Sequence, residues 1–359
     1  MNGPVVLTIM ALAGARPSPA ERAAESCGSC HDVTRRDWKA SAHAEAGTNS
    51  LFRAGFEVEP RSFCIACHAP EAQRAEEGIG CVTCHEAKRD GRRAAPPAAA
   101  VAARGPAPGV AGHAVPLRTR DELRDPTFCR SCHEFPTPAF EGGRRRDTVL
   151  PMQSTYTEWL AYARRGGAGT CQSCHMPGGR HVMAATRDIE LLRGALSVTV
   201  RELPDSVALI LASAGVGHAF PTGDLFRHLT VEVRPLQDGG DNEENDGGGW
   251  RTVVRIGRTF ATRLDRATLR AYKEETANTS LLPGAPRVVP LPGRGRSLLW
   301  RVRYHYGSER DETRGLVPAD ALVTTLAQGR TGLENGTAHS AGLADAAGPR
   351  PMSCRSSSP

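Results

Sequence analysis

The sequence predicts a fold in two parts: short helices and long connections in the N-terminal half, followed by an antiparallel β-sandwich-like domain. Cysteine pairs recur between residues 27 and 190, and beyond residue 195 Gly-rich and Pro-rich turns separate strand-length apolar segments. Only 5% of the 359 residues are aromatic, so the first part has few large side chains with which to build a core. We therefore expect something other than side chains to fill part of that core.

Ten of the eleven cysteines form five Cys-x-x-Cys pairs, and a histidine follows each pair directly. This is the pattern of c-type haem attachment, in which two thioethers hold the porphyrin and the adjacent histidine ligates the iron. The sequence thus predicts five c-type haems, and at one haem per roughly 33 residues the porphyrins themselves would form the core. The predicted covalent attachments are Cys27 and Cys30, Cys64 and Cys67, Cys81 and Cys84, Cys129 and Cys132, and Cys171 and Cys174, with proximal iron ligands His31, His68, His85, His133 and His175.

Structural zinc is the main alternative, because Cys64, Cys67, Cys81 and Cys84 have a ribbon-like spacing. Five pairs cannot all combine two by two into four-cysteine sites, and zinc gives no reason for a histidine after each pair. A disulfide framework explains the pattern poorly too, since short Cys-x-x-Cys loops are redox-active more often than structural. Cys354 lies in a Ser-rich and Pro-rich tail and receives no role.

Seven histidines lie outside the motifs and could supply the second axial ligands of the irons: His43, His113, His181, His218, His228, His305 and His339. We favour His43, His113, His181 and His218 as distal ligands, against the alternative of surface or core histidines. His218 lies in a Pro-Gly turn that could present its imidazole to a haem across the domain boundary. His228 and His305 are less suited because they lie in strand-like stretches, and His339 lies in the tail.

Haem attachment of this kind implies export. Residues 5–13 form an apolar run of the length of a signal h-region, and Ala13-Gly14-Ala15 follows as a small-residue cleavage site, although residues 1–4 contain no lysine or arginine. No run reaches the roughly 18 apolar residues of a membrane span. We expect a signal peptide over 1–20, a pentahaem cytochrome c domain over 21–192, a β-sandwich-like domain over 193–327, a disordered tail over 328–359, and a periplasmic location.

Local patterns predict the elements. A helix is expected from Thr155 to Arg165, with Tyr156 and Trp159 on one face. Residues 89–112 read as an exposed linker, and the acidic stretch 238–246 as a solvated loop, because it lacks the fixed ligand order of a calcium site. Strands are expected at 196–203, 206–212, 228–234, 250–256 and 297–304.

Several segments resemble multihaem c-type cytochromes related to the tetrahaem electron carriers of ammonia-oxidising bacteria, including relatives with a C-terminal β domain. The segments are Trp38 to His43, Gly78 to Cys81, Met152 to Trp159, Gln172 to Pro177 and Gly217 to Asp224. The resemblance implies haems stacked in close pairs, mostly bis-histidine ligation and electron transfer. It also implies that one haem can lack a distal ligand. The fifth haem and the appended β domain depart from the tetrahaem carriers.

Two functions therefore compete. The first is an electron carrier between periplasmic redox partner proteins, with the β domain as a docking module and possible peripheral association with a membrane respiratory complex. The second is an oxidoreductase with one open haem that acts on a small nitrogen or sulfur species, for which we assign no catalytic residue. Pentahaem nitrite reductases use a lysine as proximal ligand at the catalytic haem, whereas all five motifs here have histidine. A mainly structural role in a respiratory complex is weaker than both.

Charge argues against a nucleic-acid partner. The formal net charge is +6, but each haem brings two propionates, so five haems offset most of it. The run of Arg144, Arg145 and Arg146 would neutralise propionates or solvate a loop.

Overall fold

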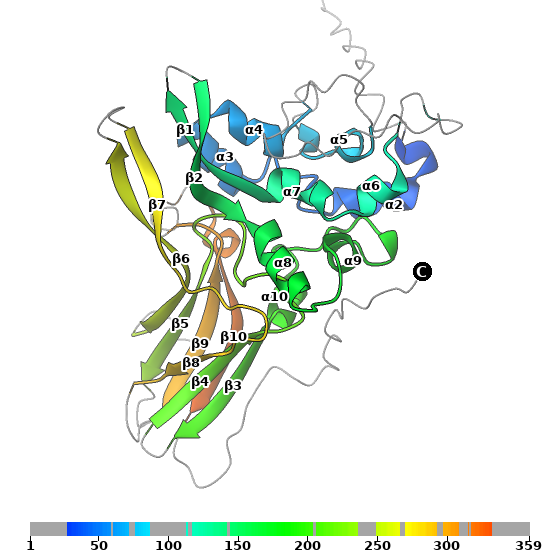
Figure 1. Ribbon diagram of the computed structural model, residues 1–359. Helices are drawn as coiled ribbons and strands as arrows, with labels where there is room; N and C mark the ends of the chain where they lie inside the picture. The colour runs from blue at the N-terminus through cyan, green and yellow to red at the C-terminus, as the bar shows by residue number, and fades with distance from the viewer. Residues whose placement is uncertain are drawn as a thin grey trace, which may run out of the picture.

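The computed structural model describes residues 27–58, 60–71, 76–86, 113, 117–141, 144–203, 206–235, 249–265, 270–292, 297–308, 315 and 317–331. Its helices gather in one part of the molecule and most of its strands in the other (Figure 1). The expected signal peptide, the linker at 89–112, the acidic stretch at 238–246, His339 and Cys354 lie outside the described residues.

The helical part consists of short helices joined by long connections, as predicted. They are α2 (Asp32–Lys39), α3 (Ser50–Val58), α4 (Ser62–His68), α5 (Cys81–His85), α6 (Arg120–Arg124), α7 (Thr127–His133), α8 (Thr155–Arg164), α9 (Cys171–His175), the 3-10 turn η2 (Pro177–Gly179) and α10 (Ile189–Gly194). None of α3, α4, α7, α8 and α9 buries a residue. A helix is normally stabilised by burying an apolar face, so these helices need a group other than side chains to pack against.

A β-hairpin interrupts the helical part and was not predicted. Strands β1 (Glu134–Glu141) and β2 (Arg144–Ser154) pair antiparallel, and the register shifts at Pro136 and again before Pro138. Proline cannot donate to a ladder and is confined to edges and irregular positions of sheets. The prolines and the run of arginines interrupt the alternation of apolar and polar residues by which a strand is predicted, so this hairpin was missed.

The remaining strands form two antiparallel sheets. The five-stranded sheet has the order β10-β9-β5-β6-β7 and the three-stranded sheet the order β3-β4-β8. The strands are β3 (Leu196–Leu203), β4 (Ser206–Ser213), β5 (His228–Pro235), β6 (Arg251–Asp265), β7 (Arg270–Asn278), β8 (Arg287–Pro290), β9 (Leu298–His305) and β10 (Val323–Thr331), with the 3-10 turn η3 (Ala319–Ala321) before β10. All five predicted strands are present, while β7, β8 and β10 are additional.

Both sheets contribute to one hydrophobic core. Leu209 and Leu211 of β4 meet Leu229 and Val231 of β5 and Val302 of β9 there, and all five side chains are fully buried. The last strand corrects one boundary, because β10 continues to Thr331. The first residues of the expected tail therefore belong to a sheet, whose ladder pairs even the polar Gln328 with Arg301.

The two parts of the molecule are held together by polar contacts. The long β6–β7 hairpin extends beside β1 and β2 (Figure 1), where the guanidinium of Arg258 donates to the carbonyl oxygens of Pro151 (2.6 Å) and Met152 (2.7 Å). The Tyr306 hydroxyl donates to the carbonyl oxygen of Thr186 (2.9 Å). No helix in the described part of the chain is long and apolar enough to cross a membrane.

Candidate haem-binding sites

Each of the last four motifs ends a short helix at its histidine: α4 at His68, α5 at His85, α7 at His133 and α9 at His175. In the first motif, residues 27–30 are helical and the amide of His31 donates to the Cys27 carbonyl (2.8 Å). Positions i, i+3 and i+4 share one face of a helix. The helical turn therefore places both sulfurs and the imidazole of a motif on the same side, as attachment to one porphyrin requires.

Four of the five motif histidines face a second histidine from elsewhere in the chain, with ring centroids 5.8 to 6.2 Å apart. The pairs are His31 with His113, His133 with His43, His85 with His181, and His175 with His218. The second members are the four distal candidates proposed from the sequence.

This spacing suits a metal ion between two imidazoles. Two ring nitrogens that bind one metal from opposite sides, each at about 2 Å, place the ring centroids roughly 6 Å apart. Rings in direct contact lie closer, as His228 and His305 show with centroids 4.2 Å apart and planes inclined by 10°. The four pairs therefore fit axial ligation of iron, and the pair His228 and His305 does not.

Hydrogen bonds orient several of these rings for ligation. Nδ1 of His175 donates to the Ala184 carbonyl (2.6 Å), Nδ1 of His181 to that of Gly179 (3.1 Å), and Nδ1 of His218 to that of Ala219 (2.9 Å). Because a carbonyl can only accept, Nδ1 carries the proton and Nε2 keeps its lone pair. Metal-bound histidines in proteins usually have this second-shell arrangement.

Burial also keeps two distal candidates neutral. It lowers the pKa of His43 to about 4, with a further contribution from the charge of His175, and it lowers the pKa of His218 to about 4. A histidine must be deprotonated to bind a metal. Both imidazoles are therefore in the ligating form at neutral pH.

The second motif differs from the other four. The ring of Phe52 stacks on the face of His68, with centroids 4.1 Å apart and planes inclined by 9°, and Nδ1 of His68 donates to the Ala46 carbonyl (2.9 Å). Among the described residues no histidine is paired with His68 at the spacing of the other four. Burial lowers the pKa of His68, while the nearby charge of Asp224 raises it and that of Arg227 lowers it.

The motifs lie close together. The Cys81 thiol is hydrogen-bonded to Cys27, which joins the first and third motifs, and burial raises its pKa. Cys129 and Cys171 are hydrogen-bonded to one another, which joins the fourth and fifth motifs. This hydrogen bond raises the pKa of Cys129 most, and the charge of Cys84, in the third motif, raises it further. Burial lowers the pKa of both His68 and His133, and the charge of Arg227 lowers both further, so the second and fourth motifs lie near the same arginine. The five motifs thus form one continuous cluster.

Nine of the ten motif cysteines are free thiols, the form from which thioethers are made.

A buried carboxylate near the first motif was not predicted as a site residue. Asp37 accepts hydrogen bonds from Arg180 Nε (3.0 Å) and Nη2 (2.5 Å) and from the backbone of His181, and the hydrogen bond from Arg180 lowers its pKa most. Asp37 thereby ties the loop that carries His181 to α2. Phe52, which packs on His68, was not predicted either, because nothing in its local pattern separates it from an ordinary apolar helix residue.

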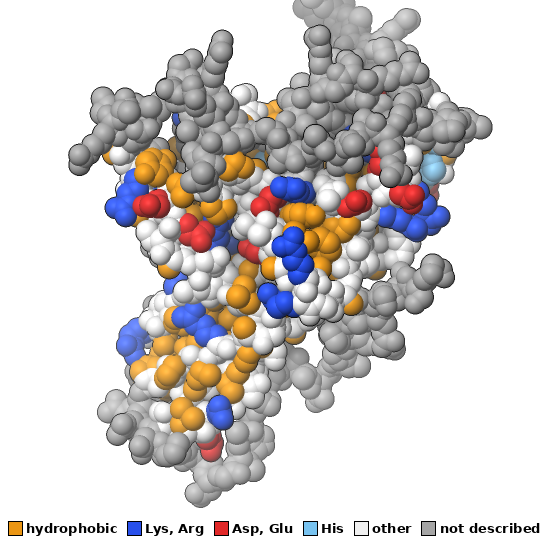
Figure 2. Space-filling view, in the orientation of Figure 1, with side chains coloured by type: hydrophobic (Ala, Val, Ile, Leu, Met, Phe, Trp, Pro, Cys, Tyr) orange, Lys and Arg blue, Asp and Glu red, His pale blue; other side chains and the backbone are white. Residues whose placement is uncertain are grey.

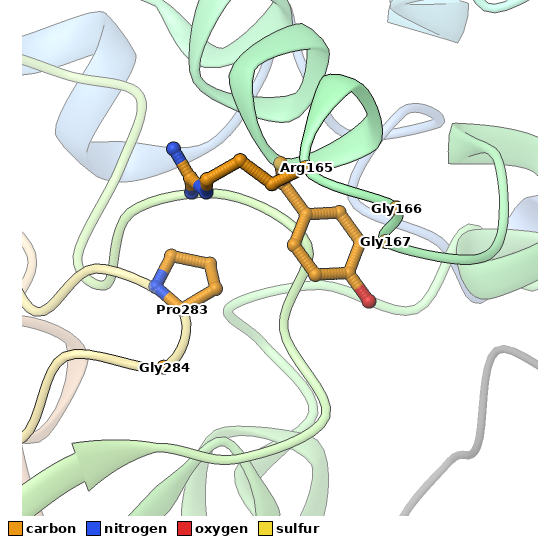
Figure 3. A pocket seen from close by; sticks show the side chains of 6 residues that line it. Arg165, Gly166, Gly167, Pro283 and Gly284 are labelled. Carbon is orange, nitrogen blue, oxygen red and sulfur yellow. The ribbon is translucent and has the colours of Figure 1, made fainter.

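One surface pocket lies at the C-terminal end of α8. Its lining includes Arg165, Gly166 and Gly167 after α8 and Pro283 and Gly284 from the loop before β8, around a cavity of about 280 Å³ (Figure 3). Its lining contains no histidine or cysteine.

Comparison with known proteins gives a match at the level of structure. No protein-family model matches the sequence, and no curated protein matches it. Among solved structures, the crystal structure of a penta-heme cytochrome c552 from Thermochromatium tepidum is similar, with a TM-score of 0.58 and 21% sequence identity. The similarity covers 86% of this chain and 97% of the cytochrome. The chain therefore shares its overall fold with a penta-heme cytochrome.

Proposed function

We propose that the protein is an exported, periplasmic electron carrier with five covalently bound c-type haems. The observation that carries the proposal is the pairing of four motif histidines with four remote histidines at ring separations near 6 Å. The similar fold of a penta-heme cytochrome supports it.

The chain's own residues have two tasks in this function. The motif cysteines would hold the haems, and His31/His113, His85/His181, His133/His43 and His175/His218 would provide the axial ligands of the first, third, fourth and fifth. When bound, c-type haems supply one-electron chemistry. The sheets, as a separate domain from about residue 193, would present a surface to redox partners.

The first test is haem content and spin state. Intact mass and haem spectra of the purified holoprotein should give five haems per chain, and electron paramagnetic resonance of the ferric form should show mainly low-spin signals. Each single replacement of His113, His181, His43 or His218 by alanine should convert one haem from low-spin to high-spin. His305→Ala should convert no haem, because the pair of His228 and His305 has no room for a metal. Fewer than five haems, or loss of a low-spin signal in His305→Ala, would contradict the proposal.

A second function is favoured by the second motif. His68 packs against Phe52 and has no histidine opposite it among the described residues, so the haem of this motif would keep an open face for a small nitrogen or sulfur compound. Arg227 lies within electrostatic range of His68 and could hold an anionic substrate. Carbon monoxide binding to the ferrous protein separates the two functions: about one molecule per five haems indicates an open site, and none indicates a carrier with closed irons.

A further inference from the structure

The fifth pair depends on a loop that comes from the β-sheet part of the molecule. This loop, residues 217–224, lies between β4 and β5 and carries His218. The ring of His218 is 6.2 Å from that of His175 on α9, and the two planes are inclined by only 5°. A ligand delivered from another part of the chain needs something to hold its loop in register with its partner.

On one side the sheets hold this loop. The amides of Phe220 and Leu281 each donate to the other residue's carbonyl (both 2.8 Å), and the buried Phe220 ring packs against Tyr304 with centroids 5.9 Å apart. These contacts fix the loop to its own domain. They do not fix it relative to α9.

On the other side α8 holds the loop to the helical part through the carboxylate of Glu158 and through the hydroxyl of Thr155, which lies 2.9 Å from the hydroxyl of Thr222. Oε2 of Glu158, on α8, accepts from the backbone amide of Ala219 (3.2 Å) and from the hydroxyl of Thr222 (2.6 Å). Oε1 accepts from the hydroxyl of Ser154 (3.2 Å), just before α8. The carboxylate thus joins residues on both sides of the domain boundary.

The contacts continue from Glu158 to the imidazole. Glu158 holds the amide of Ala219, and the carbonyl of the same residue accepts from Nδ1 of His218 (2.9 Å). That acceptor fixes the tautomer and leaves Nε2 for the metal. Movement of Ala219 would therefore turn or shift the His218 ring.

The next turn of α8 packs on the start of the same loop. A Cβ added to Gly217 would lie 3.2 Å from Cδ1 of Tyr162 and 3.6 Å from Cδ1 of Trp159. Glu158, Trp159 and Tyr162 therefore surround the two residues on either side of His218. Tyr162 also lines the pocket of Figure 3.

We propose that Glu158 is the positioning residue of the fifth haem site, holding His218 opposite His175 across the boundary between helices and sheets. The inference rests on the proposed function, because the haem at Cys171 and Cys174 is itself proposed. Asp37 has a similar arrangement, since this carboxylate on α2 accepts from Arg180 and from the backbone of His181. For two of the four distal histidines, a carboxylate on a helix thus binds the loop that carries the histidine.

The test compares Glu158→Ala with Glu158→Gln and with Glu190→Ala as a matched control. Glu190 is an exposed residue of α10 whose carboxylate accepts a hydrogen bond from Arg193 (3.0 Å) and makes no contact with the loop that carries His218 in the described structure. Haem content is measured first, because fewer than five haems in the unaltered protein would refute the proposed function rather than this inference. Each variant that retains five haems is then examined in the ferric state by electron paramagnetic resonance and in the ferrous state with carbon monoxide.

In Glu158→Ala we expect one low-spin haem in five to become partly high-spin, up to about one additional carbon monoxide bound per chain, and added imidazole to restore the low-spin signal. Glu158→Gln should remain close to the unaltered protein, because its amide oxygen can still accept from Ala219 and Thr222. Spectra and carbon monoxide binding in Glu158→Ala equal to those of Glu190→Ala would overturn the inference. Should Glu158→Ala fail to fold, Thr222→Val removes the 2.6 Å contact with Glu158 together with the 2.9 Å contact with the Thr155 hydroxyl, and an unchanged fifth haem in that variant would likewise overturn the inference.

Discussion

At the residue scale, the buried histidines are of two kinds that differ in the space between rings. Pairs such as His175 and His218 leave about a metal's width between imidazoles, whereas His228 and His305 stack directly. The stacked pair is integrated into its sheet: Nδ1 of His228 donates to the Phe226 carbonyl (2.7 Å), and the Thr230 hydroxyl lies 2.9 Å from Nε2 of His305. Here the hydrogen bonds maintain a sheet rather than orient a ligand.

The stacked pair makes stability depend on pH. Burial lowers the pKa of His228 to about 4, and His305 and Arg255 contribute. In the unfolded chain His228 binds a proton below about pH 6.5, whereas in the folded protein it does so only below about pH 4. Its contribution to stability is therefore complete above pH 6.5 and is lost as the pH falls toward 4. Relative to His228→Gln, the protein should lose up to about 3 kcal/mol of unfolding free energy between pH 7 and pH 4. Urea unfolding at several pH values measures this, and parallel curves for both proteins would contradict it.

The structure places each of the four distal candidates opposite a motif histidine, in pairs that distance along the chain does not predict. His43 lies soon after the first motif, yet its ring faces His133 of the fourth, and His181 lies just after the fifth motif, yet faces His85 of the third. Nearness along the chain misleads because the connections are long. Glu158 is one of many acids on helices, and only the folded loop shows that its carboxylate meets Ala219 and Thr222.

At the element scale, the β6–β7 hairpin is attached to the helical part by one buried guanidinium. Arg258 is 5% exposed and donates to Glu275 (2.6 Å) as well as to the carbonyls of Pro151 and Met152. Farther along the same hairpin, Arg263 pairs with Glu274, but both side chains are largely in solvent. The two pairs have the same chemistry and differ in burial.

We expect Arg258→Met to reduce the unfolding free energy by about 3 kcal/mol or more, because it leaves Glu275 and two carbonyls without their donor. Arg263→Met should change it by less than about 1 kcal/mol, as is usual for an exposed ion pair. Thermal unfolding of both holoprotein variants followed by circular dichroism provides the comparison. Equal destabilisation of the two would show that burial of Arg258 does not matter.

Pattern reasoning found the long apolar strands and missed β7, β8 and β10, although β8 and β10 place Val289 and Leu326 in the shared core. β5 and β9 carry the apolar residues of the core, including Leu229, Val231 and Val302. β7 is rich in polar residues, with Lys273, Glu274 and Glu275 in succession, and forms half of a hairpin rather than a core strand. A strand without a buried face has no alternation to detect.

At the scale of the whole molecule, the helical part and the sheets differ in what fills them. The hydrophobic cluster lies in the sheets with Leu192 of α10 at its edge, while five helices around the motifs bury no residue. On the face shown in Figure 2, acidic and basic side chains are interspersed rather than separated by sign. Strong attraction to a polyanion is therefore not expected from this face.

The charge of the holoprotein is a prediction at the same scale. The formal charge of the chain is +6 and its isoelectric point from sequence is 8.8. Each oxidised c-type haem contributes about −1 through its propionates, so five would leave a net charge near +1. Isoelectric focusing of the ferric holoprotein should give a value clearly below 8.8. A value at or above 8.8 would mean that fewer haems are attached or that their propionates are neutralised.

The pairing of distant histidines also has a consequence for biogenesis. His43 leaves the ribosome soon after the first motif and His181 soon after the fifth, so an unfolded chain brings each nearest to a histidine that it does not face in the native structure. Native pairs close long loops, and structures dominated by long-range contacts form slowly. With haems attached as proposed, ligation of an iron by the histidine nearest in sequence would be a kinetic trap during folding. Competing imidazole during refolding should release it and increase the yield of native protein.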